Sequence, residues 1–259
     1  MDTTLEQQQP LSPLVQRPRH VHDITDRFSM VNTYVIDDGR LIVVDPGSIL
    51  TVQLLLAYLQ RYLHRSAADI DLIVLTHLHP DHTSGVETLR QACHAPVAAS
   101  IVAHYLVQKW QGEELHLAEP QATIMNNMLT QAMSQHSRPG ILHHQDLFSL
   151  SYERQARLVD LWLEDVASLP NHPTWRVIFS PGHTPESLCL YNPFSYELLC
   201  GDTAVSVEGE ATLVRNGMNR RQLEQTLSIL RALKVYYLYP AHGRPLLSHQ
   251  ALLNARVEW

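Results

Sequence analysis

The sequence feature that most constrains this chain is a dense run of metal-binding side chains, His77-Leu78-His79-Pro80-Asp81-His82. The apolar run Leu72-Ile73-Val74-Leu75 precedes it almost directly and predicts a buried strand. In open α/β structures, ligands bind at the carboxyl ends of the strands. Three imidazoles and a carboxylate at this density therefore predict a site for one or two divalent cations, with further ligands supplied from elsewhere in the chain.

The composition of the 259-residue chain is that of a globular protein, with 45% hydrophobic and 17% charged residues. The formal net charge of -7 and the lack of a long basic run argue against a nucleic-acid partner. Residues 1–13 predict a polar tail that is not a signal peptide, and no run reaches the ~20 apolar residues of a membrane span. We therefore expect a cytoplasmic protein with no membrane contact, whose cysteines are buried thiols: Cys93, Cys189 and Cys200.

Hydrophobic patterns predict strands and helices along most of the chain. The predicted strands are 15–21, 30–36, 41–44, 72–75, 96–99, 175–179, 188–191, 197–200 and 235–238. The predicted helices are 51–65, one that carries Val86, Leu89 and Cys93, 101–110, 219–234, and a short one from about residue 248. Two sheets that face each other, with the helices outside, are the simplest layered arrangement of these elements.

The stretch 111–173 interrupts this alternation and predicts a helical insertion without a strong strand. One helical pattern carries Ile124, Met125, Met128, Leu129 and Met133, and a second carries Leu158, Trp162, Val166 and Leu169. The loop between them includes His143-His144, which we interpret as a surface pair. The methionine-rich helix is either core or, because methionine adapts to varied ligands, part of a lid over a substrate pocket. We thus expect one domain over 14–259 with an insertion or lid at about 111–173.

Three further candidate ligands, His183, Asp202 and His242, each lie at or just past the end of a predicted strand, beside Gly or Pro. Each one alone is more typical of an ordinary turn, because Asp in particular favours turns. Together with the 77–82 run, they predict four loops that converge on one sheet edge. Asp45, in Asp45-Pro46-Gly47, follows another predicted strand, and both a turn role and a site role stay open for it.

The order of these motifs resembles that of the metallo-β-lactamase-fold hydrolase superfamily. The resemblance rests on Asp45-Pro46-Gly47, the 77–82 run, Pro181-Gly182-His183-Thr184, Gly201-Asp202-Thr203 and Ala241-His242-Gly243. It covers about residues 32–243, with the insertion outside it. It implies an α/β fold, an αβ/βα four-layer sandwich with the site on its open edge. The sequence around 43–47 and 181–185 is most similar to hydroxyacylglutathione hydrolases (glyoxalase II).

The resemblance also implies a complete binuclear metal site. One metal would be held by His77, His79 and His183, and the other by Asp81, His82 and His242, with Asp202 bridging both. Asp45 would order these ligands from behind. Asp81 and His242 are expected to take part in catalysis, Asp81 by taking or returning a proton. The two divalent ions are expected to be zinc, with iron or manganese as alternatives.

The implied activity is that of a metal-dependent hydrolase. Two cations generate hydroxide from water and polarise an ester, thioester or lactone-like carbonyl of a small-molecule substrate. Three alternatives stay open: a mononuclear iron persulfide dioxygenase-like oxidoreductase, a phosphodiesterase of the same fold, and a relative that only binds an effector. The basic and Tyr pair that grips glutathione in glyoxalase II is not evident in 205–212. The oligomeric state is also open, with a dimer as one option.

Overall fold

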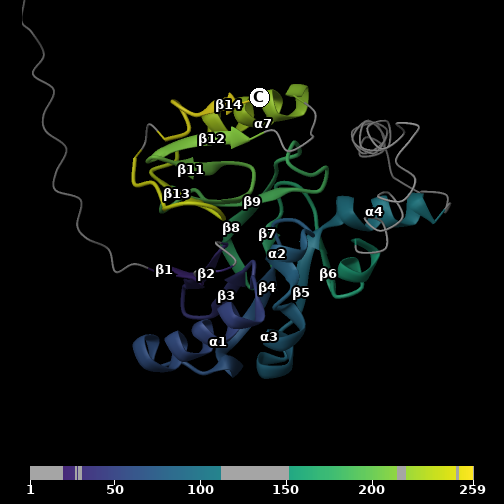
Figure 1. Ribbon diagram of the computed structural model, residues 1–259, viewed down its shortest axis with the longest axis vertical. Coiled ribbons are helices and arrows are strands. Elements are labelled where there is room, and N and C mark those ends of the chain that lie inside the picture. Colours follow the sequence, from purple (N-terminus) through teal and green to yellow (C-terminus); the bar gives the residue numbers. More distant parts are fainter. Residues whose placement is uncertain are drawn as a thin grey trace, which may run out of the picture.

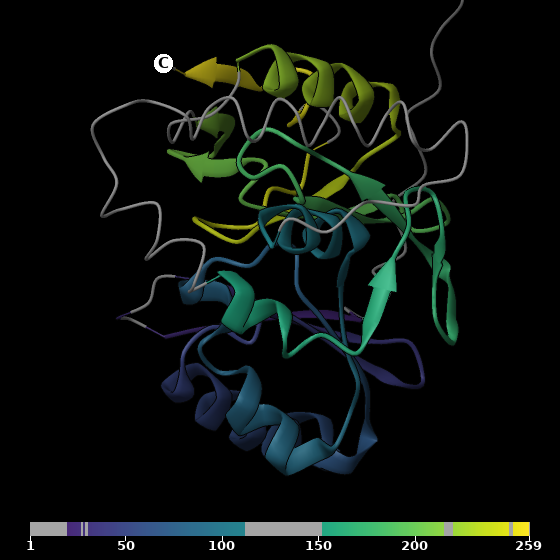
Figure 2. The same ribbon diagram turned by 90° about the vertical axis from the view of Figure 1, so that its right-hand side faces the viewer.

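The computed structural model describes residues 20–26, 28, 31–111, 152–214, 220–248 and 251–258. Two β-sheets face each other at its centre, and helices cover their outer faces (Figures 1 and 2). Helices α1 (Ile49–Tyr58) and α3 (Val86–Cys93) pack on the sheet of the N-terminal half. Helix α7 (Arg220–Ala232) packs on the other sheet. This layering confirms the predicted αβ/βα sandwich.

The first sheet has six strands in sequence order, β1-β2-β3-β4-β5-β6. Strands β1 to β3 form an antiparallel meander, and β3 to β6 run parallel. Parallel neighbours need a crossover connection, which α1 supplies between β3 and β4, and α3 between β4 and β5. The strands are β1 (Val21–Thr25), β2 (Asn32–Asp37), β3 (Leu41–Val44), β4 (Ile70–Val74), β5 (Val97–Ser100) and β6 (Leu161–Leu163). The further helical segments are Leu59–Leu63, Ala67–Asp69 and α4 (Ile101–Trp110).

The second sheet has five strands in the order β13-β10-β9-β8-β7. Both β8 and β10 run antiparallel to β9, and β13 runs parallel to β10, so β8, β10 and β13 end at the same edge. A small third sheet has the order β11-β12-β14. The strands are β7 (Ser168–Leu169), β8 (His172–Phe179), β9 (Leu188–Asn192), β10 (Glu197–Gly201), β11 (Val205–Val207), β12 (Glu210–Val214), β13 (Tyr237–Pro240) and β14 (Arg256–Glu258).

Side-chain alternation along the central strands divides the core into layers. In β2 and β3, Ile36 and Ile42 belong to the cluster between the two sheets, which also contains Trp175 of β8. Val35 and Val43 point the other way and belong to the cluster under α1 and α3. Because these strands are buried on both faces, they are apolar runs rather than alternating patterns. The third cluster lies between the second sheet and α7, which contributes Leu223, Leu227 and Leu230.

The helix predicted over 158–169 is wrong. Residues 161–163 form β6, which pairs in parallel with β5, and 168–169 form β7, which pairs antiparallel with β8. Leu163 and Leu169 are buried between the sheets, whereas Val166 is exposed. The apolar residues recur at helical spacing only because two short strands and a turn carry them, and pairing with neighbouring strands decides the structure. The C-terminal end of the predicted insertion therefore belongs to the two sheets.

The remaining differences lie near the chain ends and at one hairpin. The first described strand, β1, begins at Val21, and the sequence patterns do not predict the β11–β12 hairpin. Where a helix is predicted from residue 248, the described residues form turns and β14, which pairs in parallel with β12. The tail 1–13, the helix over 124–133 and the His143-His144 pair lie outside the described residues. Within the described ranges, no helix has the length and apolar character needed to cross a membrane.

Candidate metal centre

The loop after β4 carries four of the seven predicted ligands. Helix α2 (Pro80–Thr83) begins inside this loop, with His79 at its N-cap and Pro80 in its first turn, where a missing N–H costs no hydrogen bond. The short helix brings Asp81 and His82 next to each other at the sheet edge. His82 is fully buried, whereas the side chain of Asp81 is 48% exposed.

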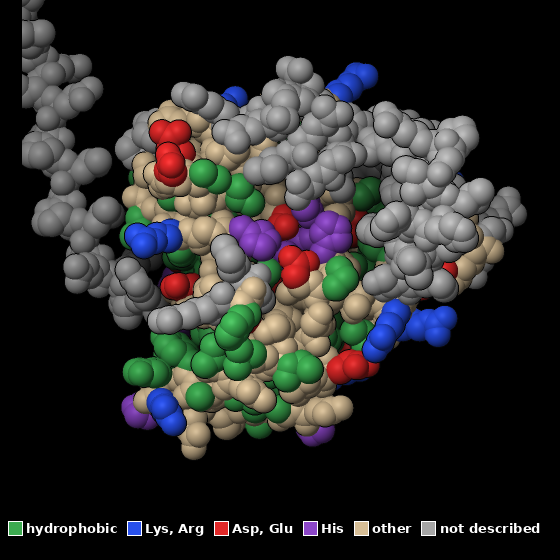
Figure 3. Space-filling model, viewed as in Figure 1, with side chains coloured by type: hydrophobic (Ala, Val, Ile, Leu, Met, Phe, Trp, Pro, Cys, Tyr) green, Lys and Arg blue, Asp and Glu red, His purple; other side chains and the backbone are tan. Residues whose placement is uncertain are grey.

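The other three predicted ligands follow strands of the second sheet. His183 follows β8, Asp202 follows β10 and His242 follows β13. Because these strands end at the same edge, their loops meet the loop after β4 there. Figure 3 shows histidine and acidic side chains gathered at the centre of one face. The structure thus brings all seven residues together in two groups. Within each group, the ligand atoms lie within 4.8 Å of one another.

The first donor set consists of His77, His79, His183 and Asp202. His77 Nε2 lies 2.9 Å from His79 Nδ1, which lies 3.0 Å from His183 Nε2. Asp202 Oδ2 lies 3.3 Å from His183 Nε2 and 4.0 Å from His77 Nε2. A tetrahedral zinc ion with bonds of 2.0–2.1 Å places its donors ~3.3 Å apart. The four distances lie on both sides of this value, so the four atoms are close enough together to hold a single metal ion.

The second donor set consists of Asp81, His82 and His242, with Asp202 beside it. Asp202 Oδ1 lies 3.4 Å from both His82 Nε2 and His242 Nε2. Asp81 Oδ2 lies 3.8 Å from each of the same two nitrogens. His82 Nε2 and Asp202 Oδ1 are buried without a hydrogen-bond partner in the described part of the chain. Buried polar atoms of this kind are costly unless something satisfies them, and a cation between them fits that need.

Asp45 supports the second set from behind. Its Oδ1 accepts a hydrogen bond from the Thr76 backbone N–H at 2.8 Å. Its Oδ2 accepts one from the Thr76 hydroxyl at 2.7 Å and lies 3.0 Å from His82 Nδ1. With Nδ1 bound to Asp45, the Nε2 lone pair of His82 is left for a metal. Asp45 has a φ of 50°, which non-glycine residues rarely adopt, so it combines a backbone turn with an ordering role.

Burial and neighbouring carboxylates give the histidines of the two sets different protonation states. It lowers the pKa of His77 and His79, and that of His183 to about 4, so these three imidazoles are neutral near pH 7. Burial alone would also lower the pKa of His82, but the Asp45 and Asp202 carboxylates raise it to about 10. In the metal-free protein, a proton on His82 therefore balances the carboxylates, and a bound cation would replace that proton.

Glycine at position 201 lets Asp202 approach the loop after β4. Gly201 has a φ of 50°, and a Cβ at this position would collide with Thr76 Oγ1. The same Thr76 hydroxyl donates a hydrogen bond to Asp45. The end of β10 therefore touches the residue through which Asp45 contacts the metal-binding loop, and only glycine allows so close an approach.

One residue of this region, Glu186, is not predicted from the sequence. Its side chain is buried, and its Oε1 accepts a hydrogen bond from the backbone N–H of Leu78 at 3.4 Å. Leu78 stands between His77 and His79, two members of the first set. An acidic residue in a Pro-containing turn is typical of a solvated position, so only the folded structure shows that this carboxyl group faces the loop.

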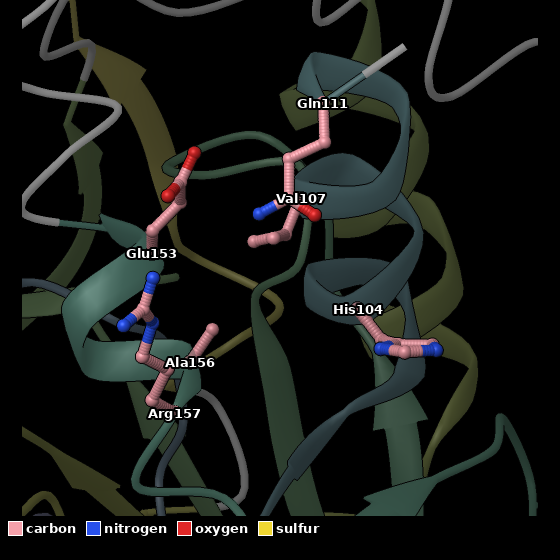
Figure 4. Close-up of a pocket in the computed structure, with 6 residues that line it drawn as sticks. All are labelled: His104, Val107, Gln111, Glu153, Ala156 and Arg157. Carbon is pink, nitrogen blue, oxygen red and sulfur yellow. The ribbon is translucent and has the colours of Figure 1, made fainter. Parts of the chain in front are cut away.

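A cavity of about 170 Å³ lies apart from the cluster, between α4 and the helical turn at 152–156 (Figure 4). Its lining residues are His104, Val107, Gln111, Glu153, Ala156 and Arg157. None of them belongs to either donor set. The convergence of seven ligand-type side chains, and not this cavity, identifies the candidate functional site.

Comparison with known proteins places the chain in a family. The chain is 26% identical over 220 residues to the probable metallo-hydrolase MJ0888 of Methanocaldococcus jannaschii, covering 82% of this chain and 87% of the relative. It resembles the metallo-beta-lactamase family protein TTHA1429 of Thermus thermophilus, with a TM-score of 0.57, 19% identity and coverage of 90% and 76%. The di-iron-bound form of TTHA1623 gives a TM-score of 0.58, 20% identity and coverage of 90% and 98%. Such low identities in the solved structures show the fold alone. The sequence model of the metallo-beta-lactamase superfamily matches residues 26–242, and the chain belongs to that superfamily.

Proposed function

We propose that this protein is a binuclear metal-dependent hydrolase that cleaves an ester, thioester or lactone-like carbonyl bond of a small molecule. One observation carries the proposal: the two carboxylate oxygens of Asp202 face two different donor sets. A carboxylate shared in this way suits two cations a few ångströms apart. Zinc is the proposed metal because it accepts imidazole and carboxylate donors in tetrahedral sites, with iron and manganese as alternatives.

Bound cations would supply the chemistry by lowering the pKa of water and polarising a carbonyl oxygen. The chain itself prepares the donors, because His77 and His183 are held neutral and Asp45 orients His82. Asp81 is the half-exposed carboxylate at the cluster, so it is placed to pass a proton between solvent and the reacting group. Part of His242 is also exposed, which makes this side of the cluster the one that substrate reaches.

One feature favours a carbonyl substrate over a phosphate ester. The motifs around 43–47 and 181–185 are most similar to those of hydroxyacylglutathione hydrolases, so thioesters are the first substrates to test. The relative from Methanocaldococcus jannaschii, named a probable metallo-hydrolase, supports the broader reaction class.

The test is a substrate panel with metal analysis on the same sample. Protein purified without chelator is assayed on thioesters, lactones, phosphodiesters and β-lactams, and its metal content per chain is measured. We expect close to two metals per chain and turnover of a thioester, ester or lactone. Asp202→Ala should lose activity and metal at both positions, whereas Glu87→Ala, an exposed acidic residue in the first turn of α3, should keep both.

Three outcomes would contradict parts of this proposal. One tightly held iron per chain, with oxygen uptake on glutathione persulfide, would replace the hydrolase by a mononuclear dioxygenase. Turnover of phosphodiesters alone would be consistent with the proposed metal site but would refute the proposed carbonyl substrate. Full metal occupancy in Asp202→Ala would contradict the bridging role of Asp202.

A further inference from the structure

We propose that Glu186 is a positioning residue that sets the metal affinity of the first donor set. It also connects that set to the stem of the insertion, by which we mean the packed pair Trp110 and Tyr152. The proposal rests on the proposed function, because it concerns the metal position formed by His77, His79 and His183. Glu186 is not itself a ligand candidate, and none of the sequence motifs assigns it a role.

The first contact of Glu186 is with the loop after β4. Its Oε1 accepts the hydrogen bond of the Leu78 N–H at 3.4 Å, and both residues are buried. This N–H belongs to the peptide that joins His77 to Leu78. Fixing its direction restricts the backbone between the two histidines, and therefore the angle at which their imidazoles approach each other.

The second contact is with the loop that carries His183. Glu186 lies in a tight turn in which the Thr184 N–H donates to Ser187 Oγ at 3.1 Å and the Ser187 N–H donates to the Thr184 carbonyl at 3.4 Å. The two hydroxyls are 2.7 Å apart. Glu186 is thereby held at a fixed position relative to His183. One carboxyl group thus joins the two loops that supply all three histidines of the first set.

The third contact is with the stem of the insertion. The Tyr152 hydroxyl lies beside the Glu186 carboxyl group: burial first, and then this neighbouring carboxyl group, raise the pKa of Tyr152. The Tyr152 ring packs edge-on against Trp110, with ring centroids 5.1 Å apart. Trp110 is the last residue of α4, and Tyr152 is the first described residue after position 111. The pair therefore lies at the two ends of the predicted insertion's undescribed stretch. Desolvating a carboxyl group is costly, and the hydrogen bond from the Leu78 N–H and the neighbouring Tyr152 hydroxyl offset part of that cost only while the loop, the turn and the stem keep their places.

Zinc affinity measured at one position at a time distinguishes positioning from general stabilisation. The His242→Ala background leaves only the first donor set complete, and the His183→Ala background leaves only the second. In the first background, Glu186→Ala should lower zinc affinity at least tenfold, within the 10–100-fold typical of residues that orient ligands. In the second background, its effect should be less than twofold. Glu186→Gln, which keeps the size and one oxygen acceptor, should restore most of the affinity, and Tyr152→Phe should have a smaller effect of the same kind.

Glu197→Ala is the matched control. Glu197 is also a buried carboxylate, but it starts β10, at the opposite end from Asp202, and its Oε1 accepts a hydrogen bond from the Tyr239 hydroxyl at 3.0 Å. Its removal should lower the melting temperature without changing zinc affinity in either background.

Unchanged zinc affinity of Glu186→Ala in the His242→Ala background would overturn the proposal. So would an equal loss in both backgrounds, because that is the result expected of a general structural role. If Glu186→Ala does not fold, Tyr152→Phe decides by the same comparison, because Glu186→Gln is expected to keep most of the affinity. Unchanged zinc affinity of Tyr152→Phe in the His242→Ala background would then overturn the proposal. Because zinc titration needs no substrate, a wild-type protein that binds two zinc ions but hydrolyses nothing would refute only the proposed function.

Discussion

Replacing Asp45 by Asn tests how the second donor set is prepared for a metal. The variant keeps the size of the side chain but exchanges one carboxylate oxygen for an NH₂ group. In the native protein, the two oxygens serve the Thr76 N–H at 2.8 Å, the Thr76 hydroxyl at 2.7 Å and His82 Nδ1 at 3.0 Å. An amide accepts through one oxygen only, so whatever partners face the NH₂ group meet a donor instead of an acceptor.

His82 is the partner that can adapt, because the Thr76 N–H is a fixed donor while an imidazole can change tautomer. We expect the amide oxygen to stay on the Thr76 N–H. The NH₂ group then faces the Thr76 hydroxyl, which can turn to accept a hydrogen bond, and His82 Nδ1. Without the Asp45 charge, His82 would lose its Nδ1 proton and keep the proton on Nε2, where a metal needs the lone pair. Restoring the metal-binding tautomer leaves a buried donor unpaired, which costs ~1–3 kcal/mol. That cost corresponds to about 5- to 150-fold in metal affinity, since 1.4 kcal/mol is tenfold.

Zinc titration against a chromophoric chelator measures this loss, and ¹⁵N NMR of the imidazoles reports the tautomer. We expect Asp45→Asn to weaken the binding of one of two zinc ions. In the metal-free variant, His82 should be neutral and protonated at Nε2 only, whereas the raised pKa of wild-type His82, about 10, keeps both nitrogens protonated at neutral pH. The control is Thr33→Val, which removes a hydrogen bond to the Asp45 backbone carbonyl at 2.6 Å and leaves the carboxylate alone. Two zinc ions bound with native affinity by Asp45→Asn would refute the reasoning.

Three further predictions follow from the same geometry. The chelator-treated protein should be most stable near pH 6.5, because the lowered pKa of His183, about 4, makes stability rise from pH 4 to 6.5, and the raised pKa of His82, about 10, makes stability fall from pH 6.5 to 10. A melting temperature that climbs steadily from pH 6.5 to 9 would contradict this. Gly201→Ala should cost ~1–3 kcal/mol more than Gly209→Ala, because both glycines have positive φ but only a Cβ at 201 meets another residue; equal melting temperatures of the two variants would exclude the collision. Zinc at about 1,000 times its Kd should stabilise the metal-free protein by ~4 kcal/mol per site, measured as a rise in melting temperature, and an unchanged melting temperature would argue against binding to the folded state.

The candidate site could be predicted from the sequence because each of its residues carries a local signal. The run His77–His82 is dense in ligand-type side chains, and His183, Asp202 and His242 each follow an apolar strand beside Gly or Pro. Parallel strands that end at one edge bring such residues together without further information. The layered fold follows from the same strands, whose apolar runs are long enough to identify.

Features that depend on tertiary contacts could not be predicted. Trp162 and Leu169 have helical spacing, but β6 pairs with β5 and β7 with β8, and no local pattern contains those partners. Glu186 stands in a turn that is typical of solvent exposure, and only the packing of Tyr152 and Leu78 around it makes it a buried acceptor. Residues of this kind are identified by what surrounds them after folding.

The spacing of the two donor sets is decided by how the sheets pack, and not by any one loop. The first sheet supplies the loop after β4, and the second supplies Asp202 at the end of β10. The two meet at Thr76, which donates to Asp45 on one side and lies against Gly201 on the other. The core between the sheets, with Trp175 fully buried at its centre, holds this contact in place. A change in that core would move Asp202 relative to both histidine groups at once, so the metal centre and the fold share the same stabilising contacts.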